Sequence, residues 1–357
     1  MRLFIFIYMN KGLREKYVCT LPFHYTEISD NSQWLCCPSW LPEDILETDN
    51  YKDNWYSEKS DKIRESMLDG SYKYCDSKQC PYLSSLDNGK VTTPQFMEKS
   101  KFLKSNFMTP EPAVINMGFD TSCNLQCPSC RLNFVNLKGE DRARVNRTID
   151  KISDEIGSTL HTMVLCGAAD PFFSKSFFNF MANFDETKFP ALKLIHLHTN
   201  ANLWTPRNWE RISKVHKYIK TCEISIDAAT KDTYENKVRL RGKWDKLMDN
   251  LEFISSIPTL KRLRFSFVTQ AMNYKEMYPF YELIQNITQG KGKKVEVLYN
   301  GIVDWGAYPS KEDFLKEEIH NPEHPEYPEF LKELDKIKTL NVYHNFGHII
   351  PRVKTML

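Results

Sequence analysis

The sequence predicts an α/β protein whose larger part is built on a parallel sheet. After residue 110, short apolar or β-branched runs alternate with longer amphipathic runs, which is the pattern of repeated βα units. Hydrophobic residues make up 41% of the 357 residues, enough to form a sizeable core. By contrast, the first 95 residues are rich in turns and contain five of the ten cysteines, so we expect a smaller, irregular domain there.

Six strands are expected in the larger part, at Val114–Phe119, Met163–Cys166, Leu194–His198, Cys222–Ile226, Leu263–Val268 and Val295–Leu298. Helices are expected between them, at Asp141–Glu155, Ser174–Phe184, Arg207–Val215, Lys231–Ile254 with a break near Gly242, and Lys275–Ile287. Six βα units in one direction with right-handed crossovers give either an open doubly wound sheet or a partial barrel.

These patterns divide the chain into four parts. We expect the cysteine-rich domain at residues 1–95, a linker at 96–109, the parallel α/β domain at 110–305, and an extension at 306–357 with one helix, Glu329–Lys338.

Composition excludes several function classes. A net charge of +2 gives no strong attraction to nucleic acid or to a membrane surface, so a nucleic-acid modifier has little support. No apolar run approaches the ~20 residues of a spanning helix. Leu3–Met9 is short and no cleavage pattern follows it, so we interpret it as no signal peptide, and Met9 is a candidate natural start. Ten cysteines without an export signal predict a cytoplasmic protein in which clustered thiols bind metal.

The stretch TSCNLQCPSC places Cys123, Cys127 and Cys130 directly after the first expected strand. Parallel α/β sheets hold their chemistry beyond the carboxyl ends of the strands, so this loop is expected at the active edge. Three thiolates on a [4Fe–4S] cluster leave one iron open for an external chelating ligand. The alternatives are a zinc site completed by a distant residue, or plain buried thiols. Ligand softness and the position of the loop favour the cluster.

The spacing Cys123-x3-Cys127-x2-Cys130 resembles the signature of the radical S-adenosylmethionine (SAM) superfamily, over residues about 110–300. The resemblance implies a partial (β/α)6 barrel of the TIM type, and SAM bound to the [4Fe–4S] cluster. It also implies reductive cleavage of SAM to a 5′-deoxyadenosyl radical that abstracts hydrogen from a substrate. A reductase such as flavodoxin or ferredoxin is then the expected electron donor. One position departs: the family usually has an aromatic residue before the third cysteine, and here it is Ser129.

The same resemblance implies a set of SAM-binding residues after the second to fourth strands. GAADP at 167–171 is similar to the family's Gly-Gly-Glu-Pro stretch, and Thr199-Asn200 to its Thr-Asn-Gly, with Ala201 replacing the glycine. In the motif SID at residues 225–227, strand alternation points the side chains of Ser225 and Asp227 to one face. The resemblance implies that both hydrogen-bond the ribose of SAM. The implied cofactor-binding residues are Gly167, Ala168, Asp170, Asn200, Ser225 and Asp227.

Further pocket candidates have weaker signals. Gln270 and Asn273 follow the fifth expected strand, and Arg239 and Arg241 either pair with a carboxylate of SAM or substrate or form a solvated face.

The N-terminal cysteines make a second four-ligand set, composed of Cys19, one of Cys36 and Cys37, Cys75 and Cys80. Adjacent residues in an extended chain point in opposite directions, so only one of the pair is expected to ligate. Four thiolates suit zinc or a saturated [4Fe–4S] cluster. The spacing resembles the SPASM module, which carries auxiliary clusters but usually follows the barrel. The resemblance implies an auxiliary [4Fe–4S] cluster, favoured over zinc, and a count from the SDN turn favours Cys36.

Three cysteines remain, of which Cys166 and Cys222 lie in expected strands and are interpreted as small buried hydrophobes. A sharper hypothesis is that the Cys166 thiol returns a hydrogen atom to a substrate radical. His196 and His198 share one face of the third strand, but no third metal ligand is evident, so we expect pocket-lining or core histidines.

The expected function is hydrogen abstraction from a peptide or a sugar-like small molecule held between the two clusters. The outcome is oxidation, crosslinking or epimerisation, and the auxiliary cluster anchors the substrate or accepts an electron. The alternative is a metal-stabilised SAM- or ligand-binding protein without radical turnover, which the GAADP departure and Ser129 favour.

Overall fold

The computed structural model describes residues 12–93, 95–105, 109–165, 167 and 169–346. The segment Leu3–Met9 and the predicted site residues Cys166 and Ala168 lie outside the described residues.

A nine-stranded sheet organises the described chain, in the spatial order β3-β2-β5-β6-β7-β8-β9-β10-β11. All neighbours are parallel except β2 and β3, which pair antiparallel. Its strands are β2 Tyr25–Ser29, β3 Ser32–Trp34, β5 Val114–Met117, β6 Thr162–Leu165, β7 Leu194–Thr199, β8 Ile219–Ser225, β9 Arg262–Thr269, β10 Lys294–Gly301 and β11 Val342–His344. The fold is therefore α/β with a large, mostly parallel sheet, as predicted.

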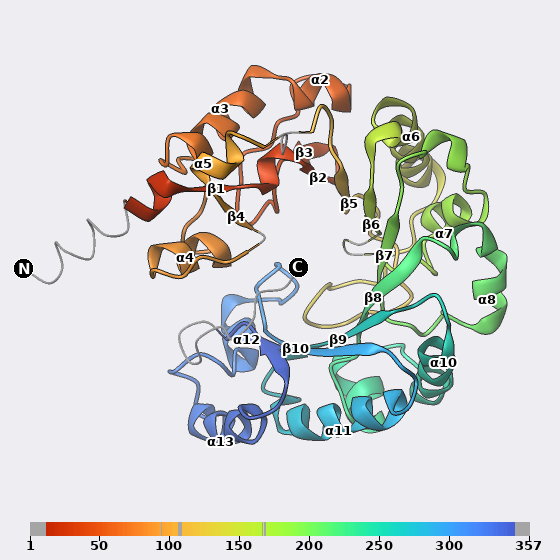
Figure 1. Ribbon diagram of the computed structural model, residues 1–357. Helices are drawn as coiled ribbons and strands as arrows, with labels where there is room; N and C mark the ends of the chain where they lie inside the picture. The colour runs from red at the N-terminus through yellow and green to blue at the C-terminus, as the bar shows by residue number, and fades with distance from the viewer. Residues whose placement is uncertain (1–11, 94, 106–108, 166, 168, 347–357) are drawn as a thin grey trace, which may run out of the picture.

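Helices connect the parallel strands and lie on the outer side of the arc that the sheet follows (Figure 1). They are α6 Gly139–Glu155, α7 Lys175–Ala182, α8 Pro206–Arg211, α9 Lys231–Thr233, α10 Trp244–Ser256 and α11 Met277–Thr288, with α13 Tyr327–Ile337 at the end of the arc. The helix α12 Lys311–Glu317 lies between β10 and α13 along the chain. Short helical turns at Gly157–Thr159, Glu186–Lys188, Ser213–Val215, Tyr234–Val238 and Tyr274–Glu276 complete the connections.

The two faces of the sheet differ in chemistry. Alternate residues such as Ile115, Met163 and Leu197 are buried in one hydrophobic core with the helices. The intervening residues, such as His196 and Glu223, are only half-buried and face the inner side of the arc. Polar side chains on the inner face can form a site there, while the helices supply the burial that stabilises the sheet.

The six predicted strands are confirmed as β5 to β10, in sequential spatial order. The predicted helix Lys231–Ile254 is indeed broken, because a π turn ends at Val238, and Arg241 has a φ of 72°. Gly242 follows Arg241, and an added Cβ at this glycine would lie 2.5 Å from the Tyr234 ring. The sheet has edges at β3 and β11, so a partial barrel stays compatible with it but remains a prediction.

The N-terminal residues form their own hydrophobic cluster around Trp55 and Ile63, yet β2 and β3 belong to the main sheet. The other elements there are β1 Tyr17–Cys19, η1 Leu21–Phe23, α2 Tyr51–Trp55, α3 Glu58–Leu68 and α4 Pro81–Asp87. The expected linker contains β4 Phe96–Glu98, which pairs with β1, and α5 Lys99–Phe102. The division into domains stays a prediction. Within the described residues, we find no helix with the length and apolar character needed to cross a membrane.

Candidate active site

The triplet cysteines lie on the loop between β5 and α6, at the carboxyl end of the parallel strands. Cys123 and Cys127 are buried, whereas Cys130 is exposed. Backbone hydrogen bonds hold the loop in place: Cys123 N donates to Val135 O across the loop (3.0 Å), and Gln126 N donates to Leu240 O, which follows the π turn (3.1 Å). The thiols are thus presented from a defined backbone at the edge where the sequence predicts the chemistry.

Each triplet sulfur has a polar N–H group beside it. Asn200 Nδ2 lies 3.7 Å from Cys123 Sγ, Arg239 Nη1 lies 3.4 Å from Cys127 Sγ, and the neighbouring Arg131 lies 3.5 Å from Cys130 Sγ. Such donors stabilise thiolates and the negative charge of a thiolate-ligated cluster.

Burial favours the protonated thiol at the two buried cysteines, Cys123 and Cys127. Burial raises the pKa of Cys123 to about 12 and also raises the pKa of Cys127, although Arg239 opposes the latter shift. Binding a metal at this loop must therefore release protons.

The spacing of the sulfurs bears on a single zinc ion. A single zinc with Zn–S bonds of ~2.3 Å brings its sulfur ligands to about 3.8 Å from one another. Among the described residues, the three triplet sulfurs do not all lie within 4.8 Å of one another, so a zinc ion would have to draw them together.

Asp227 and Arg239 form a buried ion pair behind Cys127. Arg239 Nη2 lies 2.6 Å from Asp227 Oδ2, with side-chain exposures of 11% and 2%. Burial opposes the charge on Arg239, but Asp227 and Cys127 raise its pKa above the usual value, so the guanidinium stays charged. The partner carboxylate of Arg239 is therefore one of this chain's own, and Asp227 is committed to the pair.

The backbone around Asp227 is held in an unusual conformation. Asp227 has a φ of 62°, its Oδ1 accepts from Val268 N (2.8 Å), and Asn273 Nδ2 donates to its carbonyl oxygen (2.9 Å). Asn273 Oδ1 also accepts from Gln270 N (2.7 Å). The pocket candidates Gln270 and Asn273 thus fix the end of β9. The other arginine candidate, Arg241, packs over the Phe134 ring, with its guanidinium carbon 4.0 Å from the ring centroid.

Asp170 joins three of the loops at the active edge. Its Oδ2 accepts from Thr199 Oγ1 (2.7 Å) and from Asn200 N (2.8 Å), and its own N–H donates to Ser122 O (2.9 Å). Burial raises the pKa of this carboxyl, against the hydrogen bonds that lower it. Asp170 therefore connects the end of β7 to the loop that carries Cys123.

Two backbone positions explain the glycine-rich patterns seen in the sequence. Gly167 has a φ of +97°, and an added Cβ would lie 2.7 Å from the Cα of Gly118, so no other residue fits without movement. Ala201 adopts a φ of 60°, the left-handed region in which glycine is favoured.

Ser225, the predicted ribose-binding residue, lies on β8. Its hydroxyl shares a hydrogen bond with the hydroxyl of Ser266 on the neighbouring strand β9 (2.9 Å).

The four N-terminal cysteines are brought together at one cavity. Cys19, Cys36, Cys75 and Cys80 line one small cavity, alongside apolar side chains such as Phe96. The adjacent Cys37 is absent from the lining of this cavity.

The thiols that line the cavity are shifted toward their protonated form. Burial raises the pKa of Cys19 to about 12, with a further rise from Cys80, and the pKa of Cys36 rises for the same reasons. Metal binding at this cavity must therefore release protons, and four thiolates are a ligand set for zinc or for a saturated cubane.

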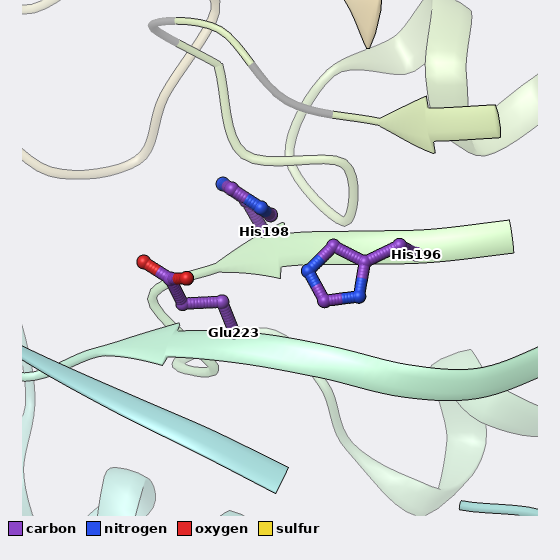
Figure 2. Close-up of side chains that lie close together, drawn as sticks. All are labelled: His196, His198 and Glu223. Carbon is purple, nitrogen blue, oxygen red and sulfur yellow. The ribbon is translucent and has the colours of Figure 1, made fainter. Parts of the chain in front are cut away.

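The sequence predicted only two members of a third group of possible metal ligands. His196 and His198 on β7 are joined by Glu223 on β8, and one ligand atom from each lies within 4.8 Å of the others (Figure 2). Glu223 is the register partner of His198. Alternation in the expected strand Cys222–Ile226 places Glu223 on the polar face, but only the pairing of the two strands brings it to the histidines.

No protein-family model matches the sequence, and no curated protein matches it. Solved structures that resemble the chain include one described as "Structure of TYW1 with a lysine-pyruvate adduct bound". That similarity has 15% sequence identity and a TM-score of 0.35, and it covers 63% of this chain and 73% of that chain. A similarity at this level decides neither the fold nor the function, so the function depends on the residues of the site.

Proposed function

We propose that this protein is a radical SAM enzyme. The observation that carries the proposal is a loop at the active edge of a parallel sheet, on which Cys123, Cys127 and Cys130 each lie beside an N–H donor. When bound there, a [4Fe–4S] cluster supplies the electron that cleaves SAM, and the resulting radical abstracts hydrogen from a peptide or sugar-like substrate. The product is an oxidised, crosslinked or epimerised molecule.

The surrounding residues take two kinds of role in this proposal. Asn200 and Arg239 donate to the cluster thiolates and set the charge around them. Asp170 and Asp227 already accept from groups of the chain, so we assign them as positioning residues that hold the loops. Gly167 lets two backbones approach closely, and Ala168 and Ser225 belong to the proposed SAM surface by resemblance alone.

We further propose that Cys19, Cys36, Cys75 and Cys80 hold one auxiliary [4Fe–4S] cluster, in a SPASM-like module placed before the barrel. Their convergence on one cavity, without Cys37, supports this assignment. The cluster would anchor the substrate or accept an electron from the product radical. A cytoplasmic reductase such as flavodoxin or ferredoxin is the expected donor of the first electron.

A second candidate function is a metal-stabilised protein that binds SAM or another ligand without radical turnover. The oxygens of Asp170 and Asp227 are largely committed within the chain, and Ser129, which stands where an aromatic side chain is usual, is buried. Both features reduce the contacts left for the nucleoside.

The test begins with anaerobic purification and quantification of iron and sulfide. We expect about eight irons in the full chain, from two cubanes, and about four after Cys123, Cys127 and Cys130 are changed to alanine. Dithionite and SAM should yield 5′-deoxyadenosine only with the triplet intact. Cys222→Ser is the matched control, because that buried thiol lies on β8 outside both sets, and iron should be unchanged. Colourless, iron-free protein that leaves SAM intact would refute the enzyme.

A further inference from the structure

The inner face of β7 and β8 carries three metal-binding side chains that the proposed chemistry does not use. His196, His198 and Glu223 are all half-buried, and one ligand atom from each lies within 4.8 Å of the other two. The two imidazole rings lie 4.9 Å apart at 81° to each other, so they are not stacked and present their nitrogens from different directions. Figure 2 shows the histidines on one strand and the glutamate on its neighbour.

We propose that His196, His198 and Glu223 bind one divalent transition-metal ion, zinc or ferrous iron. Two imidazoles and one carboxylate are the protein ligands of catalytic zinc sites and of non-haem iron sites that keep open positions. Bonds of about 2.1 Å need ligand atoms about 3–3.5 Å apart, so small side-chain rotations close the site. The remaining positions take water or an oxygen-bearing ligand from the inner side of the sheet.

A supporting hydrogen bond orients one of the histidines. His196 Nδ1 lies 2.5 Å from Thr221 Oγ1, a residue of the adjacent strand. When Nδ1 donates to this hydroxyl, the Nε2 lone pair is left for the metal. Metal-ligating histidines usually make such a hydrogen bond with the other ring nitrogen, which fixes the tautomer.

Nearby charges both compete with a metal and offer a test of it. Arg264 Nη1 lies 3.4 Å from Glu223 Oε2, while its Nη2 lies closer, 3.1 Å, to Glu296 Oε2. Glu296 also contacts Arg262 at 3.8 Å and Lys294 at 2.9 Å. The guanidinium of Arg264 is therefore shared, and its contact with Glu223 is the longer one. Removing Arg264 should free the carboxylate and raise metal affinity.

The experiment uses the full chain, loaded anaerobically with iron and sulfide and then given zinc. Zinc content after desalting and zinc K-edge absorption report the site without interference from iron. We expect the wild-type chain to retain about one zinc ion more than His198→Ala. The coordination shell of that additional zinc should contain nitrogen and oxygen at ~2.0–2.1 Å. Glu223→Gln, which preserves side-chain shape, should weaken zinc binding by more than about tenfold. His161→Ala alters an exposed histidine just before β6 and should leave zinc binding unchanged.

Arg264→Gln should change zinc affinity in the opposite direction from Glu223→Gln, because it should tighten zinc binding. If the three side chains served only in packing, this increase would not be expected. Circular dichroism spectra of all variants establish that they fold. Equal zinc content in wild type and His198→Ala would overturn the proposal, as would retained zinc whose shell contains only sulfur at ~2.3 Å. Zinc binding needs no SAM, so this result is independent of the proposed radical chemistry.

Discussion

The ion pair behind Cys127 offers a sharp test of how the active edge is held together. Arg239 and Asp227 lie 2.6 Å apart with side-chain exposures of 11% and 2%, so solvent screens them little. In Arg239→Met the carboxylate of Asp227 stays buried without its partner, and removing one partner of such a pair costs about 3–5 kcal/mol. Cys127 also loses the donor at 3.4 Å.

The companion variant is Asp227→Asn, which tolerates the φ of 62° and keeps an oxygen for Val268 N. We expect the double variant to cost about 2–3 kcal/mol less than the sum of the two single variants, because both charges are then gone. Arg241→Met is the matched control. It is exposed and packs on Phe134, so its loss should cost about 0.5–1 kcal/mol.

Anaerobic urea denaturation followed by circular dichroism measures these differences, with iron content determined for every variant. If Arg239→Met costs no more than Arg241→Met, the pair does not stabilise the fold and the reasoning fails. Strict additivity of the two single variants would equally show that Asp227 and Arg239 act independently.

Three further predictions concern other parts of the chain. Cys36→Ser should lower the iron content by about four atoms while Cys37→Ser leaves it unchanged, because only the first lines the cavity; equal losses would contradict the assignment. Gly167→Ala should cost more than about 2 kcal/mol in urea, since its Cβ would meet Gly118, against about 1 kcal/mol for Gly290→Ala, which has open space. Burial lowers the pKa of His24 from 6.5, so the unfolded chain binds more protons below that pH and stability falls there. His24→Gln should flatten this acid slope, and an unchanged slope would count against it.

Much of the fold follows from local patterns. The strands β5 to β10 were predictable because apolar alternation and flanking amphipathic helices are properties of neighbouring residues. The short strands β2 and β11 were not predicted, because their parallel partners lie far away in the chain, and β3, which pairs with the nearby β2, was missed because it is so short. For example, β2 pairs with β5, so Tyr25 lies opposite Val114. Three to five residues hold too little alternation to distinguish a strand from a loop.

In the candidate site, too, contiguous segments were predictable from the sequence, whereas contacts between distant segments were not. The triplet, the GAADP stretch and the end of the fourth strand could be found by spacing, since each is a contiguous segment after one strand. Arg239 was visible only as a candidate anion partner, because its partners Cys127 and Asp227 come from other loops. The third member of the histidine cluster, Glu223, needed the register between two strands.

By itself, the sequence determined where the six central strands lie along the chain and the loop on which three thiols are presented, because both depend on residues close together in the chain. Only the tertiary structure decided that Arg239 reaches Cys127 across 112 residues and that Glu223 lies opposite His198. It also placed Cys36, which the sequence favoured, at the N-terminal cavity without Cys37. These contacts depend on strand pairing and on loops that meet at one edge of the sheet, and they form only when the chain is folded.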